Sequence, residues 1–295
     1  MPGSFTEKRI DLTFQLGTGS FGGGGANQVS FQGLRVQAQI EKAGMPSPGG
    51  RATILVYGMT LSQMNQLSRA GLMWDNSNNS VLVRAGDSES GMSEVFNGQI
   101  LEAYPNFDQP MAPFYVSAVP GVQVQMKPVD PTTIEGSISG EQALTQIAQK
   151  AGYTVENNGV STQLSNPYFP GTVWDQMTRC VKALDCYAYL DTSAKKIAIW
   201  PKGQSRSGGN LLVAAETGMI GYPKFQRVMV IVRTLLDTSF KFGDKFQVKS
   251  GLTAADGTWK NNRLTYDLAS QSPEGPWEMT LMGYREPQDQ PGATS

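Results

Sequence analysis

Short runs of alternating apolar and polar residues, separated by turns rich in glycine and proline, recur along much of the chain. Residues 10–16 are the first such run, and two more apolar-rich runs, 29–40 and 52–57, are separated by the glycine- and proline-rich turn 44–50. Alternation with period two is typical of strands that bury one face. The chain holds 33 Gly and 17 Pro, and only 17% of its residues are charged, against about 25% in a typical soluble domain. These features predict a mainly β fold.

Residues 1–124 read as a first strand-rich domain with one short helix. Further strands are expected at residues 81–84, 95–102 and 114–118, which makes roughly six in this segment. Thr60 and Gln63 have the spacing of a capping box, in which each side chain bonds the other residue's backbone N–H. The helix that begins there is expected to turn Leu61, Met64 and Leu67 to one face and to end at Gly71.

Residues 125–203 change character and predict a small inserted α+β domain. One helix is expected after Ser139, with a capping-box partner at Gln142 and a stop at Gly152, and a second after Thr172. A strand at 153–155 and a hairpin of strands 187–190 and 196–200 complete the domain.

Residues 204–286 return to strands and form the second strand-rich domain, opening with a polar, glycine-rich linker at 204–209. The strands are expected at residues 225–235, 240–242, 245–249, 262–268 and 277–282. Residues 287–295, rich in Pro, Gln and Gly, predict a disordered tail. The predicted fold class is mainly β (α+β), with two β-barrel or sandwich domains and the α+β domain inserted between them.

Histidine is absent from the sequence, and this removes several reaction classes. Ser-His-Asp and Cys-His nucleophilic catalysis, zinc hydrolysis through H-E-x-x-H and the H-R-D loop of kinases all need an imidazole. A pair of carboxylates or a Ser-Lys arrangement would still be compatible, but no spacing singles one out. We therefore predict that the chain is not an enzyme, and that it has no catalytic, cofactor-binding or metal-binding residues and needs no cofactor.

The two cysteines, Cys180 and Cys186, are interpreted as buried thiols, because a C-x5-C pair without histidine is a poor metal site. The formal net charge is −1, and no dense run of Lys and Arg is present, which argues against sequence-specific nucleic-acid binding. Neither a signal-peptide core nor an apolar run of about 18 residues is present. We expect a protein made in a cytoplasm, with no membrane contact.

A literal G-x-G-x-x-G occurs at residues 17–22, directly after the first predicted strand. A dinucleotide site needs a helix after its glycine loop, whereas an alternating strand follows here. A kinase would need a strand-borne Lys in a V-A-I-K motif, an H-R-D loop and a D-F-G motif; none of these three motifs is found. We interpret residues 17–26 as a mobile loop between two strands, able to order against a partner.

The second strand-rich domain contains the stretches Gly221-Tyr-Pro223, Val228-Met-Val-Ile-Val232, Leu235-Leu236, Phe240-Lys-Phe-Gly243-Asp244-Lys-Phe246, Gly257-Thr-Trp259-Lys260 and Pro273-Glu-Gly275-Pro-Trp277. In these stretches the domain resembles the baseplate hub proteins of tailed bacteriophages. The first domain is similar in style, through Val95-Phe-Asn-Gly98-Gln-Ile100 followed by Tyr104 and Phe107, and the middle module resembles the helical insertion of hub proteins.

The resemblance implies a structural hub in the tail baseplate of a virion, with tube-like domains at 1–124 and 204–286. Tail tubes are sixfold and spikes threefold, so a homotrimer would join the tube protein to the central spike or tail-tip protein, among other baseplate proteins. Viral genome ejection would pass DNA through the lumen without specific binding. Ring closure would hide strand edges, including one expected near residues 228–232. Assembly would take place in the host bacterial cytoplasm.

Two other functions stay open. One is the hub of a bacterial contractile injection system, for which a similar architecture is expected. The other is a cell-wall hydrolase that acts through two carboxylates about 5–9.5 Å apart.

Overall fold

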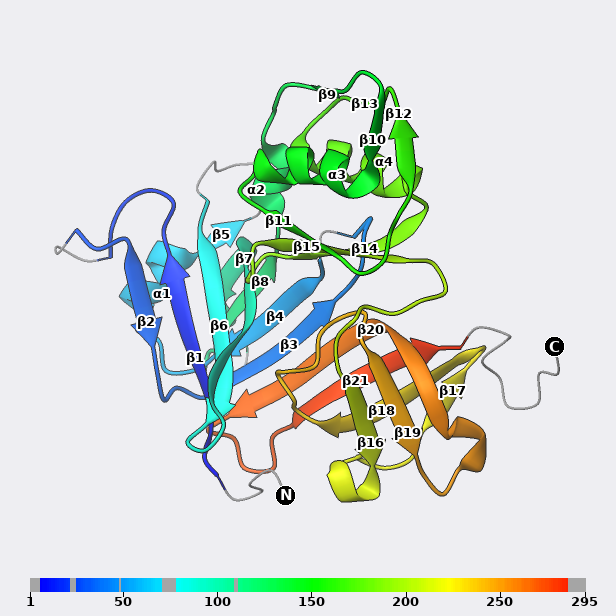
Figure 1. The fold of residues 1–295 in the computed structure, drawn as a ribbon. Helices are drawn as coiled ribbons and strands as arrows, with labels where there is room; N and C mark the ends of the chain where they lie inside the picture. The colour runs from blue at the N-terminus through cyan, green and yellow to red at the C-terminus, as the bar shows by residue number, and fades with distance from the viewer. Residues whose placement is uncertain (1–5, 22–24, 48, 71–77, 109–110, 286–295) are drawn as a thin grey trace.

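A large antiparallel sheet dominates the computed structural model, which describes residues 6–21, 25–47, 49–70, 78–108 and 111–285 (Figure 1). The sheet joins 14 strands in the order β17-β18-β21-β20-β3-β4-β8-β7-β6-β1-β2, and β16, β19 and β5 pair beside this path. Both ends of the chain contribute to it, at the lower left and lower right of Figure 1, and the middle module lies above them. The prediction of a mainly β fold with an inserted α+β module is confirmed.

The first region holds eight strands and one helix in its described residues. They are β1 (Lys8–Gln15), β2 (Gln28–Phe31), β3 (Val36–Lys42), β4 (Arg51–Val56), α1 (Leu61–Leu67), β5 (Arg69–Ala70), β6 (Ser80–Asp87), β7 (Gly91–Pro105) and β8 (Phe114–Val119).

The middle module carries three helices and a small mixed sheet of order β11-β15-β14. Its elements are α2 (Val122–Met126), β9 (Thr132–Thr133), β10 (Ser137–Ser139), α3 (Gly140–Gln149), β11 (Thr154–Asn157), β12 (Gln163–Ser165), β13 (Tyr168–Phe169), α4 (Val173–Ala183), β14 (Cys186–Asp191) and β15 (Lys196–Pro201).

The last region contributes six strands to the large sheet. The elements are β16 (Asn210–Ala214), the 3-10 helix η3 (Ala215–Thr217), β17 (Lys224–Gln226), β18 (Met229–Leu235), β19 (Lys245–Lys249), the 3-10 helix η4 (Thr253–Ala255), β20 (Gly257–Ser270) and β21 (Trp277–Tyr284). The division of the chain at residues 124, 203 and 286 stays a prediction.

The long strand β20 joins the two strand-rich regions. Residues 264–268 of β20 pair with β21 on one side and with β3 on the other. Side chains from both regions accordingly belong to one apolar core, which includes Phe14 and Ile54 from the first region and Phe246 and Leu281 from the last. The two strand-rich regions are therefore one continuous structure at this seam.

Local signals placed α1, α3 and α4 correctly, whereas α2 was missed. Thr60 and Gln63 form the reciprocal capping box of α1, and Thr172 and Asp175 form that of α4. Ser139 accepts a hydrogen bond from the backbone of Gln142 at the start of α3. Helix α1 ends at Leu67, before the expected stop at Gly71, which lies outside the described residues. Its predicted apolar face was partly wrong, because Leu61 is 58% exposed.

Three of the predicted strands were wrong. The run 29–40 is broken in two at Gly33, whose φ is +69°, and β2 and β3 then lie at distant places in the sheet. The run 225–235 is a hairpin, because Arg227 at φ 57° turns the chain between β17 and β18. Residues 240–242 are not a strand; they lead into a turn over residues 241–244, which is closed by a hydrogen bond from Asp244 N to Lys241 O (3.1 Å). Strands β5, β9, β10, β12, β13 and β16 were missed.

The hairpin of β14 and β15 is a wall shared by two cores. Tyr189, Ala198 and Trp200 belong to the core of the large sheet, whereas Leu190 and Ile199 belong to the core of the module under α3 and α4. Because successive side chains on a strand point to opposite faces, a hairpin buried on both faces must be apolar throughout. This explains the unbroken apolar runs in these two strands, and it fixes the module against the large sheet.

Candidate interaction surfaces and the junction that positions them

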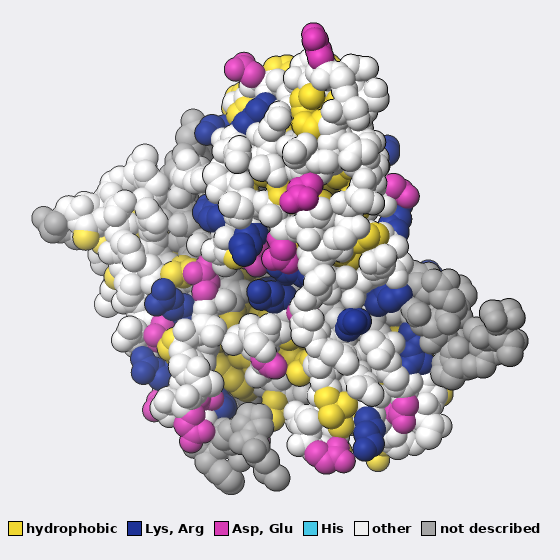
Figure 2. Space-filling model, viewed as in Figure 1, with side chains coloured by type: hydrophobic (Ala, Val, Ile, Leu, Met, Phe, Trp, Pro, Cys, Tyr) yellow, Lys and Arg dark blue, Asp and Glu magenta, His cyan; other side chains and the backbone are white. Residues whose placement is uncertain are grey.

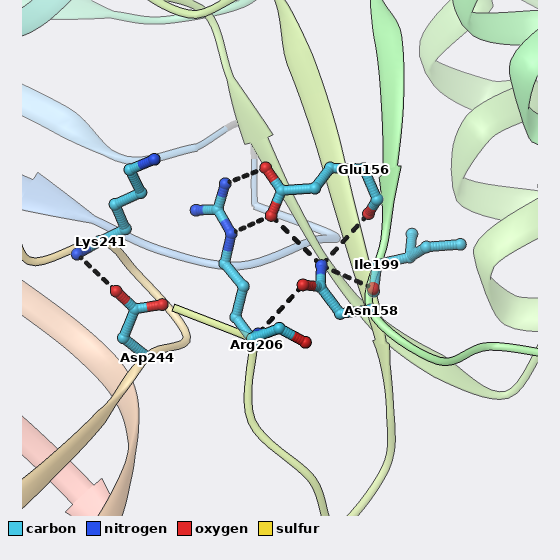
Figure 3. Close-up of polar contacts among 7 residues, drawn as sticks. Glu156, Asn158, Ile199, Arg206, Lys241 and Asp244 are labelled. Carbon is cyan, nitrogen blue, oxygen red and sulfur yellow. Dashed lines mark hydrogen bonds and ion pairs between the residues drawn. The ribbon is translucent and has the colours of Figure 1, made fainter. Parts of the chain in front are cut away.

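A buried ion pair joins the predicted linker to the middle module. Arg206, 3% exposed, donates from Nε and Nη2 to the two carboxylate oxygens of Glu156 on β11, at 2.6 and 2.7 Å (Figure 3). Two parallel bonds of this kind are the strong form of an Arg–carboxylate contact. The hydrogen bonds from Arg206 lower the pKa of Glu156 to about 2. Glu156 is therefore ionised at neutral pH, and its role is charge pairing rather than proton transfer.

Asn158 and the backbone extend this junction. The Asn158 side chain donates to the carbonyl oxygens of Glu156 and Ile199 and to the Glu156 carboxylate, and it accepts from Ser207 N at 3.0 Å (Figure 3). Arg206 N donates to the carbonyl of Gly243 at 2.8 Å. The stretch 204–209, a linker by composition, is thus tied to the module and to the last strand-rich region at the same time.

Asp244 lies on the far side of Arg206 and is 1% exposed. Its Oδ2 accepts from Lys241 N at 3.1 Å, while its Oδ1 has no partner among the described residues. Burial raises the pKa of this carboxyl, although Arg206 and the Lys241 contacts act in the other direction. The linker packs closely here, because a Cβ on Gly208 would lie 1.9 Å from Asp244 Oδ1.

Aromatic rings close the same junction on its apolar side. Phe242 stacks on Tyr189 with ring centroids 4.8 Å apart and lies 6.4 Å from Trp200. The next residue is Gly243 at φ +90°, where a Cβ would lie 2.7 Å from the Trp200 ring. The Phe242–Gly243 turn therefore requires glycine both for its φ and for the close approach.

The predicted buried thiols are confirmed. Cys180 and Cys186 are free and buried, and burial raises their pKa values to about 12 and about 11. A thiol with so high a pKa holds little of the reactive thiolate at neutral pH. Within the described ranges no three Cys, Asp or Glu side chains gather as a metal site; that the chain binds no metal or cofactor and has no catalytic residue remains a prediction.

The glycine-rich stretch connects two antiparallel strands, as expected. Leu16 N donates to Asn27 O and Phe21 N to Ala26 O, so β1 turns back into β2, and a helix does not follow the loop. Gly17 N donates to Asn79 Oδ1 at 3.1 Å, which anchors the start of the stretch. Gly22, Gly23 and Gly24 lie outside the described residues, and the mobility of the loop stays a prediction.

Exposed apolar side chains gather at two hairpins. Tyr222 (75%), Phe225 and Val228 (73%) surround the β17–β18 turn, and Phe107 and Met111 lie in the β7–β8 connection. On the face that Figure 2 shows, apolar side chains lie among interspersed positive and negative side chains, and no large patch of a single charge sign is visible. The edge expected near residues 228–232 was wrong, because β18 pairs with β17 and β21. Among the described strands, β17 and β2 end the strand order, and β16 pairs only with β19.

A family model described as Baseplate hub gp41 matches residues 9–280, which is nearly the whole chain. The chain belongs to the Baseplate hub gp41 family. It is accordingly a structural component of a baseplate, as the sequence resemblance implied. No helix in the described part of the chain is long and apolar enough to cross a bilayer.

Solved structures share the fold of this hub-family chain. A tail protein from Neisseria meningitidis MC58 aligns with a TM-score of 0.62 at 10% identity, over 96% of this chain and 99% of that one. The 43 kDa tail protein of prophage MuSo2 from Shewanella oneidensis aligns with a TM-score of 0.57 at 12% identity, over 95% and 98%. A chain of the Francisella PdpA-VgrG complex gives 0.52 at 7% identity, over 99% of this chain and 55% of that one. No curated protein matches the sequence.

Proposed function

We propose that this baseplate hub protein is a homotrimeric adaptor that joins the sixfold tail tube to the threefold central spike. The observation that carries the proposal is the sharing of one sheet by two strand-rich regions of a single chain. Three copies would arrange six such regions around an axis, which meets both symmetries. Heterologous contacts that close by rotation produce a ring of this kind, and the strands β17 and β2 at the ends of the strand order are available for them.

The middle module would project from the ring toward neighbouring baseplate proteins. Its hairpin is fixed by the shared core and by the Arg206–Glu156 pair, so the module would be held at a set angle. The test is reconstitution of the purified chain with the tail tube and spike proteins of the same phage. A complex that contains all three supports the adaptor role. Binding to only one of them would contradict it.

The ring would form part of the channel through which the genome leaves, without gripping it. The net charge of −1 supports this, because a lumen rich in Lys and Arg would retain DNA phosphates through counterion release. DNA binding by the assembled ring is expected to be negligible at physiological salt, and tight binding would contradict the channel role. The proposed site of action is the virion, after assembly in the host cytoplasm.

We also propose that the chain has no enzymatic activity, since its buried carboxylates serve the junction and its thiols are sealed in the core. Peptidoglycan turnover above that of a heat-denatured control would contradict this.

The hub of a bacterial contractile injection system is a second candidate function, favoured by the likeness to a chain of the Francisella PdpA-VgrG complex. Capsid and terminase genes beside this one would favour a phage.

A further inference from the structure

The last strand-rich region repeats the strand arrangement of the first. Five strands of the first region are neighbours in the order β3-β4-β8-β7-β6, and five of the last region are neighbours in the order β17-β18-β21-β20-β19. The strands of the two sets also follow one another along the chain in the same sequence, and neighbours are antiparallel throughout both sets. The repeat stops at the next strand, since β1 is antiparallel to β6 whereas β16 is parallel to β19.

A β-bulge fixes how the two sets correspond residue by residue. The pairing of β7 with β8 shifts register over residues 100–102 of β7, and the pairing of β20 with β21 shifts register over residues 261–263 of β20. Bulges are positioned features of a sheet, so the two can be placed on each other. The ladders then carry the correspondence across each set, and Phe225 on β17 takes the place of Ile40 on β3.

The seam between the two regions buries positions that are exposed in the repeat. Where β3 pairs with β20, Ile40 is 0% exposed and Leu268 is 1% exposed. Their counterparts are Phe225, which is 49% exposed, and Phe107, which lies two residues beyond β7 and is 67% exposed. Two aromatic side chains in solvent at these positions indicate surfaces that are covered in an assembly.

The edge of β7 that corresponds to the seam is only partly covered. Since β8 pairs with one side of this part of β7, the short strand β5 pairs with the other side, at Glu102 and Ala103. In the described part of the chain no strand pairs with Tyr104 or Pro105 on that side. The strand order sets β17 far from β7 in the sheet, so these two edges of one chain cannot pair with each other (Figure 1).

Charges on the two edges are complementary. Across the seam, Arg263 on β20 donates to the Glu41 carboxylate on β3. The counterpart of Arg263 on β7 is Glu102, and the β17–β18 turn carries Arg227; both side chains are exposed. The ion pair of the seam can therefore form between two copies of the chain with its polarity reversed.

We propose that β17 of one copy pairs antiparallel with β7 of the next copy, just beyond β5, and so reproduces the seam between chains. The register of the seam places Gln226 opposite Tyr104 and Phe225 opposite Pro105. Phe225 and Phe107 of neighbouring copies then lie diagonally on one face of the new ladder, within reach of each other. The second copy as the occupant rests on the proposed homotrimer, in which three such heterologous contacts close a ring.

Disulfide crosslinking tests the pairing in the full chain assembled with the tail tube and spike proteins. Tyr104→Cys and Gln226→Cys are placed in separate chains, because directly opposed positions of an antiparallel pair are close enough for a disulfide. The natural Cys180 and Cys186 are buried. After mild oxidation we expect a covalent pair of chains in the mixture and none with either variant alone.

Ser30→Cys on β2 is the matched control for the other strand at the end of the order. It is expected to give no crosslink with Gln226→Cys. A crosslink through Ser30→Cys in place of Tyr104→Cys, or no crosslink at all, would overturn the pairing.

Native mass spectrometry of the same assemblies separates this inference from the trimer. Three copies without the crosslink would overturn the pairing of β17 with β7 and leave the trimer standing. Crosslinked assemblies that hold only two copies would support the pairing and contradict the trimer. Absence of both the crosslink and the three copies would contradict both.

Two variants test the aromatic part of the contact. Phe225→Ser and Phe107→Ser are each expected to weaken assembly by about tenfold or more, because buried aromatic anchors dominate many interfaces. Tyr168→Ser is the matched control, since Tyr168 is 60% exposed on β13 in the middle module. Thermal melting checks that each variant is folded. Unchanged assembly in both variants, or an equal loss in the control, would overturn the proposed contact.

Discussion

Arg206 and Glu156 form a two-point ion pair across the boundary between the linker and the middle module, and the two ends of the pair are buried to different degrees. The Arg206 side chain is 3% exposed and that of Glu156 is 29% exposed. Removing one charge from a buried pair leaves the other without compensation. The cost of breaking the pair therefore depends on which partner is left behind.

Glu156→Gln is expected to lower the free energy of unfolding by about 2–4 kcal/mol, because it leaves the buried Arg206 charge unpaired. Arg206→Met is expected to cost about 1–2 kcal/mol, since the partly exposed Glu156 can still be hydrated. Urea denaturation of both variants measures the difference. The asymmetry would be contradicted if Arg206→Met were the more costly change.

The pair also predicts how stability depends on pH. The pKa of Glu156 lies at about 2 in the fold, below its usual 4.5, so its contribution is fully present above about pH 4.5 and is lost as the pH falls toward 2. The stability difference between wild type and Glu156→Gln should shrink over that window in urea titrations.

The ionisation of Asp244 has the opposite effect on stability, because burial raises the pKa of this carboxyl. Wild type should therefore gain relative to Asp244→Asn on acidification.

Gly208 and Gly209 test the close packing at the junction as a matched pair. A Cβ on Gly208 would lie 1.9 Å from Asp244 Oδ1, whereas a Cβ on Gly209 would meet nothing within 4 Å. Gly208→Ala is expected to destabilise the fold by about 1–3 kcal/mol through overpacking. Gly209→Ala should be neutral or stabilise by up to about 1 kcal/mol, by restricting the unfolded chain. Similar effects of the two changes on thermal melting would refute this packing.

Features encoded over a few residues could be predicted from the sequence. The capping boxes at Thr60 and Thr172 each use a partner three residues away, so the starts of α1 and α4 were recognisable. Alternating runs likewise indicated the strands β1, β4 and β8. The family was recognisable from the stretches of the last strand-rich region.

Non-local pairing could not be predicted. Residues 29–40 are apolar-rich throughout, and only the φ of Gly33 separates β2 from β3, which have different partners. Arg206 lies in a linker-like stretch, and its partner Glu156 is 50 residues away. The segment at Phe242 was predicted as a strand from its apolar residues. In the structure it is a turn, and Phe242 packs on Tyr189 instead of pairing in a ladder. In each case a contact between distant segments decided the outcome.

The ring of three copies is the central claim, and electron cryomicroscopy of the assembled tail tip tests it most directly. The account predicts three copies of this chain around the tail axis, with six strand-rich regions surrounding the channel, the tube on one side and the spike on the other. The first strand-rich region should superpose on the last. Six or two copies in the ring, or two strand-rich regions with unrelated folds at different distances from the axis, would contradict it.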